Sequence, residues 1–199
     1  MFFCLLSCSL HRPIHPQQFA PRRLATIVCR ESNRQRKRHN QKPLPWSEIL
    51  SEAAELYAQE LRKDAFFSHE HPQRSDLRHP KDRVRAVGGH NPNVSENIAR
   101  ITLLKVPLTQ SNVVVLDADQ YRFAHSEEGK PIPLHSYHSY AQMVVQAWLD
   151  SPGHRKNLLH EDANAIGCAN AILHRDGGVP TLVSVQLFQH TETLRRTQP

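Results

Sequence analysis

The sequence predicts an α+β domain in which helices cover a sheet in a layered α/β/α arrangement. Two stretches place apolar residues at helical spacing, one after Ser47 and one after Ser139. Two late apolar runs, residues 165–173 and 181–188, flank a turn-prone segment and are typical of an antiparallel hairpin. The 199 residues, 39% of them hydrophobic, suffice for one core, so we expect a single domain with a tail.

Positive charge is concentrated near the beginning of the chain. Residues 1–43 carry nine Lys and Arg against one acidic residue, whereas the remainder carries sixteen against eighteen. A basic segment can bind phosphate or a membrane surface, but a solvated helix face is the commoner explanation. The sequence contains no nucleic-acid motif and no apolar run long enough to span a bilayer. We therefore expect neither nucleic-acid binding nor a transmembrane segment.

The first ten residues, MFFCLLSCSL, resemble the apolar core of an export signal, although no positive charge precedes them. We interpret residues 1–20 as an N-terminal tail that carries a truncated export signal, which predicts an extracellular or cell-envelope location. Four cysteines are too few for a disulfide scaffold. Only Cys29 and Cys168 fall in the expected folded body, where one bridge and two separately buried thiols are equally compatible with the sequence.

Two helices are expected before the middle of the chain. The first covers residues 24–38, where apolar residues share one face, and it ends before Pro43. The second follows Ser47, a suitable N-cap. Its apolar residues recur at the three- and four-residue spacing of an amphipathic helix: Leu50, Ala53, Ala54, Tyr57 and Leu61.

Residues 68–93 are rich in His, Pro, Arg and Asn and predict a loop, interrupted by a short helix around residues 82–87. The run NVVVL, residues 112–116, predicts a strand that is followed by a polar loop or hairpin. A third helix is expected to begin at Ser139, because SYAQ fits the capping-box pattern. It ends at the Ser-Pro-Gly break at residues 151–153. The two late strands complete the domain.

Two histidines and one glutamate are the candidate functional residues. His69 follows the second helix, His154 follows the third helix, and Glu96 lies in SENIA. Residues just beyond element ends gather where functional residues concentrate. Two neutral imidazoles and a carboxylate can hold a zinc ion with an open position, or arrange a general base. Locally, however, His154 only opens a short helix capped by Ser151, and the separations match no metal motif.

Several motifs in order resemble the CAP superfamily of cysteine-rich secretory, antigen 5 and pathogenesis-related proteins, most closely its bacterial SCP-like branch. These motifs are FFSHEHP, SENIA, AWLDSPGHRKNLL, IGCANA and LVSVQLF. Asn33 and Arg36 also match the family's N-x-x-R pattern in the first helix. The resemblance covers residues 24–190, and it identifies residues 21–192 as the domain and 193–199 as a C-terminal tail.

The resemblance implies a three-layer α/β/α sandwich with a largely antiparallel central sheet. It also implies an open cleft that gathers two histidines and two acidic residues. His69, Glu96 and His154 match three of them, whereas Ser151 stands where many eukaryotic members have the second glutamate. Asp150 is adjacent, but one residue along a helix turns a side chain by about 100°. A mechanism that requires two acids therefore lacks one of them here.

Residues 100–138 form an insertion far longer than the loop that usually bridges this gap in bacterial relatives. Long loops in compact domains are often functional. One hypothesis is that the insertion, with NVVVL and the His-rich HSYHSY, borders the cleft and tunes what enters it. The other is that it is a surface elaboration without a role, and the sequence favours neither.

The resemblance favours a secreted or envelope-associated domain that binds a small ligand, such as a lipid, or a partner protein in the cleft lined by these residues and Ser151. The alternative is a zinc-assisted, peptidase-like hydrolase in which His69 and His154 bind zinc. In that case Glu96 ligates the metal or serves as general base. A structural role is also open, with Glu96 bound to backbone amides. We assign no catalytic residue with certainty and expect no cofactor other than this zinc.

Overall fold

A three-stranded antiparallel sheet in the order β1-β5-β4 forms the centre of the molecule. Its strands are β1 (Val94–Thr102), β4 (Ala163–Leu173) and β5 (Thr181–His190). The predicted pairing of the two late strands is confirmed, although the turn between them lies largely outside the described residues. The computed structural model describes residues 12–63, 66–106, 113–173 and 178–191.

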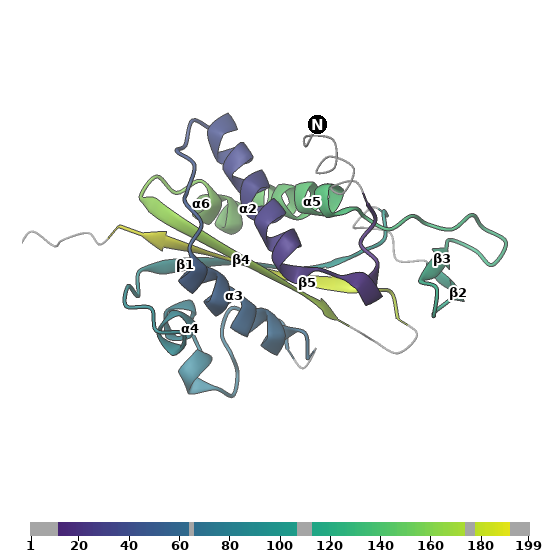
Figure 1. Cartoon of the computed structure of the whole chain (residues 1–199), viewed down its shortest axis with the longest axis horizontal. Helices are drawn as coiled ribbons and strands as arrows, with labels where there is room; N and C mark the ends of the chain where they lie inside the picture. The colour runs from purple at the N-terminus through teal and green to yellow at the C-terminus, as the bar shows by residue number, and fades with distance from the viewer. Residues whose placement is uncertain (1–11, 64–65, 107–112, 174–177, 192–199) are drawn as a thin grey trace, which may run out of the picture.

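Helices cover both faces of this sheet, as Figure 1 shows, so the chain is an α/β/α sandwich as predicted. α2 and α5 pack on one face, and α3 and α4 pack on the other. α6 follows α5 directly. The helices are α2 (Pro21–Arg38), α3 (Glu48–Leu61), α4 (Pro80–Ala86), α5 (Tyr137–Asp150) and α6 (Pro152–Leu158), with short 3-10 turns at Pro16–Gln18 and Ser75–Leu77.

The two-residue alternation of β5 divides the core into two halves. Leu182 and Phe188 contribute to the cluster under α2 and α5, whereas Val183 and Val185 contribute to the cluster under α3 and α4. All four side chains are fully buried. Because both faces of the strand are covered, TLVSVQLF carries apolar residues on both faces, although Ser184 and Gln186 are polar and buried.

The helix starts agree with the sequence in one case and differ in another. Ser47 caps α3 as predicted, because its Oγ accepts a hydrogen bond from the Leu50 amide at 3.3 Å. α5 begins earlier than predicted, at Tyr137, because Ser136 is the N-cap and Ser139 occupies the third helical position. The Ser139 Oγ accepts from the Ser136 amide at 2.9 Å, so the capping box is the earlier pair of serines.

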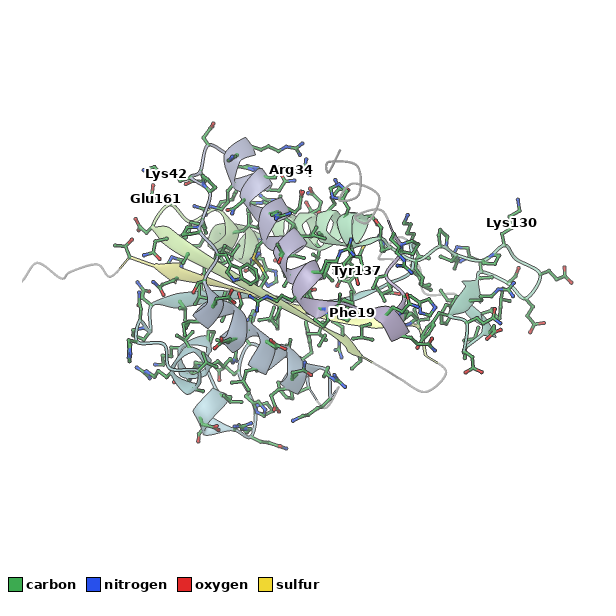
Figure 2. All side chains as sticks on the ribbon, in the orientation of Figure 1. Phe19, Arg34, Lys42, Lys130, Tyr137 and Glu161 are labelled. Atoms are coloured by element: carbon green, nitrogen blue, oxygen red, sulfur yellow. A yellow bond between two sulfur atoms is a disulfide. The ribbon has the colours of Figure 1, made fainter. Side chains whose placement is uncertain are left out.

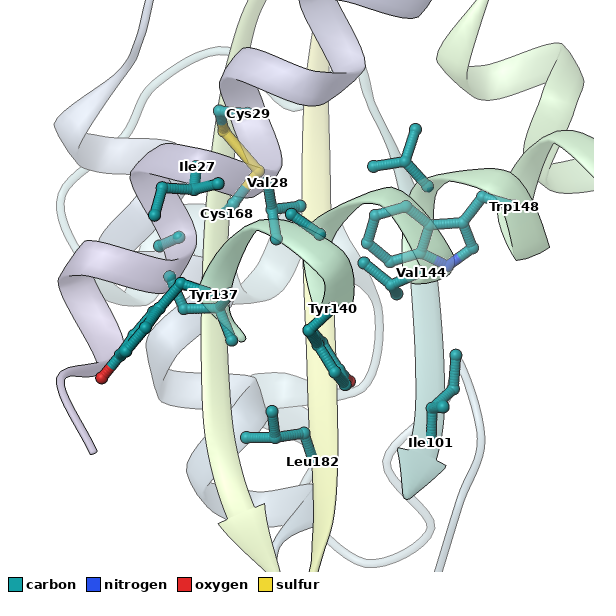
Figure 3. Packing of buried hydrophobic residues seen from close by; sticks show 14 of the residues in the cluster. Ile27, Val28, Cys29, Ile101, Tyr137, Tyr140, Val144, Trp148, Cys168 and Leu182 are labelled. Carbon is teal, nitrogen blue, oxygen red and sulfur yellow. A yellow bond between two sulfur atoms is a disulfide. The ribbon is translucent and has the colours of Figure 1, made fainter. Parts of the chain in front are cut away.

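A disulfide between Cys29 and Cys168 joins α2 to β4 across one layer of the core (Figure 3). The two Cα atoms lie 6.3 Å apart, and the bridge spans 139 residues of sequence. The sequence was equally compatible with a bridge and with two separately buried thiols, and the structure contains the bridge. The two remaining cysteines of the chain lie outside the described residues.

The insertion forms a separate lobe at one end of the sheet. It contains the hairpin of β2 (Val114–Asp117) and β3 (Arg122–Ala124), over a small cluster that includes Phe123 and Ile132. Figure 2 shows Lys130 projecting at the outer end of this lobe. The predicted strand is thus confirmed within its described part.

Candidate functional site

Glu96 lies on β1, an edge strand, and its side chain is almost completely buried. The expectation that Glu96 lies just beyond an element end is wrong, because SENIA pairs with β5 in regular register. The strand alternation turns Glu96 and Ile98 toward the layer of α3 and α4, and turns Asn97 toward α6. A carboxylate in this buried position requires partners.

Both carboxylate oxygens of Glu96 have a partner. One accepts a hydrogen bond from the Nδ1 of His69 at 2.9 Å, and the other is paired with the Nη1 of Arg83. The side chain of His69 is 50% exposed, whereas that of Glu96 is 1% exposed. The carboxylate is therefore a buried anchor that orients an imidazole at the surface.

Arg83 on α4 is the residue that completes this arrangement, and it was not predicted from the sequence. Its side chain is fully buried, and its guanidinium carbon lies 3.1 Å from the centre of the Tyr57 ring. The guanidinium also donates to three backbone carbonyls, those of His69, Leu77 and Arg78. Arg83 thus holds both the side chain of Glu96 and the loop that carries His69 in place.

Tyr57 supports the same loop from α3. Its hydroxyl donates to the carbonyl of Ser68 at 2.6 Å. Burial raises the pKa of the Tyr57 hydroxyl to about 12, although the Arg83 charge opposes that rise. The hydroxyl therefore stays protonated at neutral pH and acts as a hydrogen-bond donor, beside the residue that precedes His69.

His154 reaches the site from α6, in which it is the third residue. The Nδ2 of Asn97 donates to the His154 carbonyl at 3.1 Å, and the Nδ2 of Asn157 donates to the Glu96 carbonyl at 3.0 Å. These bonds fasten α6 to the edge of β1. The rings of His69 and His154 lie 5.9 Å apart, at an angle of 52°. The three predicted residues therefore meet in one place, together with Arg83; we call these four residues the histidine–glutamate site.

The electrostatics of the site keep His154 neutral at pH 7. Burial lowers the pKa of His154, the nearby His69 lowers it further, and Glu96 opposes both effects. A carboxylate that is paired with an arginine accepts hydrogen bonds, so the Nδ1 of His69 is the donor toward Glu96. When the ring is neutral, this leaves the Nε2 of His69 as the acceptor.

Ser151 lies at the junction between α5 and α6. Its backbone is extended, its carbonyl accepts from the Arg155 amide at 2.8 Å, and its side chain makes no capping bond to the helix. The Ser-Pro-Gly break predicted from the sequence is confirmed at this junction. Ser151 brings no second carboxylate to the site, in agreement with the sequence.

The donors at this site fit a catalytic zinc ion poorly. Within the described ranges, no three or more His, Cys, Asp or Glu side chains are grouped so that they could hold a metal ion. Catalytic zinc sites use three protein ligands. His69 and His154 offer two imidazoles, but the carboxylate of Glu96 is already occupied by His69 and Arg83.

The insertion lies at the other end of the sheet from this site. Glu96 pairs with Leu187 near the beginning of β1, whereas Thr102, from which the insertion continues, pairs with Thr181 at the opposite end. Six residues of strand span about 20 Å. For the described residues of the insertion, the hypothesis that it borders the cleft of His69 and His154 is therefore wrong.

Comparison with known proteins agrees with this fold. Residues 30–188 match a family model described as CAP, the cysteine-rich secretory protein family. The uncharacterized protein YkwD of Bacillus subtilis (strain 168) is 26% identical over 140 residues, which is 70% of this chain and 39% of that protein. The chain thus spans well under half the length of this curated relative.

Two solved structures show the same fold. An extracellular protein containing an SCP domain from Bacillus anthracis str. Ames has a TM-score of 0.56 and 21% identity, over 90% of this chain and 45% of that chain. An outer surface protein from Borrelia burgdorferi has a TM-score of 0.52 and 19% identity, over 83% of this chain and 92% of that chain. Within the described residues, no helix is long and apolar enough to cross a membrane.

Proposed function

The chain belongs to the cysteine-rich secretory protein family, and we propose that it binds a small ligand or a partner protein at the histidine–glutamate site. The observation that carries the proposal is that the rings of His69 and His154 lie 5.9 Å apart, and that His69 is bonded to the buried Glu96–Arg83 pair. The imidazole of His69 is held by the buried Glu96, and the backbone of His154 is held by the buried Asn97. Rigidly held acceptors lose little entropy when a ligand binds, which favours recognition.

The surroundings of His69 support a lipid as the small ligand. Phe67, two residues before His69, is an exposed aromatic side chain, and the guanidinium of Arg100 lies 4.7 Å from the centre of its ring. An apolar ring and a guanidinium in contact with it therefore lie two residues along the chain from the imidazole of His69. Lipids with a polar headgroup offer the complementary chemistry.

We also propose that the domain acts outside the cytoplasm or in the cell envelope. The Cys29–Cys168 disulfide supports this location, because disulfides persist in oxidising compartments. Fractionation of the native cells followed by immunoblotting tests the location, and mass spectrometry of the mature N-terminus tests export. A protein found only in the cytoplasm, with its first residues retained and its cysteines reduced, would contradict it.

The lipid form of the proposal is tested by NMR. Protein labelled with ¹³C-histidine is titrated with palmitate and with dihexanoylphosphatidylglycerol below its micelle concentration. We expect one probe to shift the ring signals of His69 and His154, and to bind at least about tenfold more weakly to an H69A/H154A variant. The H39A/H90A variant removes two histidines from the exposed surface elsewhere and serves as the control. Binding that both variants retain equally would refute a lipid site here.

The partner form is tested by crosslinking. Benzoyl-phenylalanine replaces Ser151, which is half-buried beside His154, and the variant is irradiated on its native cell surface. We expect a crosslinked protein that is lost when H69A/H154A is added to the same chain. The matched control carries the probe at the exposed Ser126, in the insertion. The same crosslink from Ser126 would overturn the partner form. No crosslink from Ser151, together with no binding of either lipid probe in the NMR titration, would overturn the proposal as a whole.

A zinc-assisted hydrolase is the second candidate, because two imidazoles lie close together. Metal analysis of the purified protein and thermal melts with and without EDTA distinguish the two functions. Under the binding proposal, the protein retains no stoichiometric zinc and its melting temperature is unchanged by EDTA. One equivalent of zinc that is lost in H69A/H154A would establish the hydrolase candidate instead.

A further inference from the structure

The positive charge near the beginning of the chain is only partly neutralised by the fold. Arg22, in the first turn of α2, is paired with Glu48 at 2.6 Å. Three cations at the end of α2 and just beyond it are exposed and form no ion pair within the described chain: Lys37, Arg38 and Lys42. These three charges are therefore open to a ligand.

The buried Arg36 holds this end of α2 against α6. Its side chain is fully buried, and its guanidinium donates to three backbone carbonyls: those of Lys42 at 2.8 Å, Leu158 at 2.8 Å and His160 at 3.0 Å. The last turn of α6 carries two further exposed cations that form no ion pair in the described structure, Arg155 and Lys156. One guanidinium thus brings together two basic segments that are distant in the sequence.

A hollow of about 520 Å³ lies between these two segments. Gln41 lines it from the loop after α2, and Glu161 lines it from the loop after α6. The outward face of α6 supplies four lining residues at three- and four-residue spacing: Pro152, Arg155, Lys156 and Leu159. Figure 2 shows Lys42, which follows Gln41, at the same end of the molecule as Glu161. The hollow therefore combines cations with apolar side chains.

The charge of this surface is positive on balance. Residues 41–42 and 152–162 contain three Lys and Arg against two carboxylates, those of Glu161 and Asp162. The buried Arg36 adds a charge that has no carboxylate partner among the described residues, and the last turn of α2 adds two exposed cations. Lys and Arg in the last turn of a helix also offset the helix macrodipole, but Lys42 lies beyond α2 and has no such role.

We propose that this hollow binds the phosphate of an anionic phospholipid headgroup, so that this face of the domain docks on a membrane surface. Clusters of about four to eight Lys and Arg on or beside a helix are typical of surfaces that bind anionic lipids, and five exposed cations gather here. Arg155 and Lys156 donate to the phosphate. Pro152 and Leu159 contact the less polar region beneath the headgroup, which favours a lipid over an acidic polypeptide.

This surface is separate from the histidine–glutamate site. The His154 carbonyl and the Asn157 side chain bond to β1, whereas Arg155 and Lys156 lie on the face of α6 that lines the hollow. Each surface can therefore be altered by substitutions that leave the other in place.

Co-sedimentation of the full chain with vesicles tests the proposal. We expect the wild type to bind vesicles of equal parts phosphatidylglycerol and phosphatidylcholine, and not vesicles of phosphatidylcholine alone. K42Q/K156Q removes two exposed cations that make no side-chain hydrogen bond or ion pair in the described structure, and should bind the anionic vesicles at least about tenfold more weakly. The matched control K81Q/K130Q removes two exposed lysines, from α4 and from the insertion, and should bind as the wild type does.

A histidine variant separates the two surfaces. H69A/H154A should bind the anionic vesicles as the wild type does. If H69A/H154A loses this binding and K42Q/K156Q keeps it, the headgroup lies at the histidine–glutamate site. That result would overturn the docking surface while supporting the lipid form of the proposed function.

The remaining outcomes separate a membrane surface from other anions. Equal losses in the two lysine variants would show general charge attraction and would overturn the proposal, as would no binding of the wild type to anionic vesicles. NMR shifts of Lys156 with sn-glycerol 3-phosphate, without vesicle binding, would assign the hollow to a free phosphate instead. Tighter binding of poly-glutamate than of anionic vesicles would assign it to an acidic polypeptide, and would also overturn the proposal.

Discussion

Arg83 is the residue on which the histidine–glutamate site depends most. It is fully buried and, among the described residues, it is the arginine that pairs with Glu96. We predict that Arg83→Met lowers the free energy of unfolding by about 3–5 kcal/mol, because it leaves a buried carboxylate without its partner. Urea unfolding followed by circular dichroism measures the loss.

The same helix provides the control for this prediction. Arg85→Met removes an exposed arginine two residues away, and we expect a loss below about 0.5 kcal/mol. Arg83→Lys should recover little stability, because one ammonium group cannot reach a carboxylate and three carbonyls at once. Equal stabilities of the Met variants at positions 83 and 85 would contradict the role given to Arg83.

His135 makes the stability of the protein depend on pH. Burial lowers the pKa of His135 to about 4, and the nearby charge of Lys105 contributes to the shift. Because the folded pKa lies below the unfolded value near 6.5, the stability contribution is complete above pH 6.5. This stability is lost as the pH falls toward 4, and the loss amounts to about 2 kcal/mol at pH 5.

We therefore predict that His135→Asn reduces the loss of unfolding free energy between pH 7 and pH 5 by about 2 kcal/mol. Urea titrations at the two pH values measure it. The exposed His90→Asn variant should keep the wild-type pH dependence. Part of the dependence should persist in the His135 variant, because burial also lowers the pKa of His154 and His190. An unchanged pH dependence in His135→Asn would contradict this assignment.

The sequence could identify His69, Glu96 and His154, because their motifs occur in a recognisable order. It could not identify Arg83, because HPKDRVRAV contains two arginines and two other charged residues in a short, largely polar helix. Whether such an arginine is solvated or buried is decided by packing from α3 and β1, which lie far away in sequence. A local pattern carries no information about that packing.

At the scale of elements, β1 is the strand that could not be predicted from the sequence. Its residues Glu96 and Asn97 are polar but buried, so the alternation of apolar and polar residues that predicts a strand is absent. Their polarity is compensated by Arg83, His69 and Asn157 from elements that are distant in sequence. α2, α3 and the late hairpin were predicted because their buried positions are apolar.

The disulfide gives a prediction for the contact between α2 and β4. Closing a loop of 139 residues restricts the unfolded chain. Loop-closure entropy sets an upper figure of about 5 kcal/mol for the stabilisation that this disulfide provides. We predict that the free energy of unfolding of a C29A/C168A variant is about 3–5 kcal/mol lower than that of the oxidised wild type. Both cysteines are buried, so alanine leaves only a small cavity term.

Reductant provides the control for the disulfide. Urea unfolding in dithiothreitol should bring the wild type close to the C29A/C168A variant and leave the variant unchanged. If oxidised and reduced wild-type protein unfold at the same urea concentration, the bridge contributes nothing to stability.

At the scale of the whole molecule, the insertion and the histidine–glutamate site lie at opposite ends of β1, so they should be independent. The two ends of the insertion lie side by side: Leu104 pairs with Leu134, and Lys105 donates its amide to the Pro133 carbonyl at 2.9 Å. Residues 106–132 can therefore be replaced by an Asn-Gly turn, which suits a two-residue hairpin. The sequence could reveal the length of this insertion but not its distance from the site, because that distance is set by β1, which was not predicted as a strand.

We predict that this deletion leaves the ¹³C ring signals of His69 and His154, and their titration midpoints, unchanged. It should lower the free energy of unfolding by about 2 kcal/mol, because Leu104 loses its contacts with Phe123 and Ile132. A Phe123→Ala variant of the full chain serves as the comparison, since it weakens the same cluster without removing the lobe. Shifted titration midpoints in the deletion, but not in Phe123→Ala, would mean that the lobe acts on the site over about 20 Å of strand.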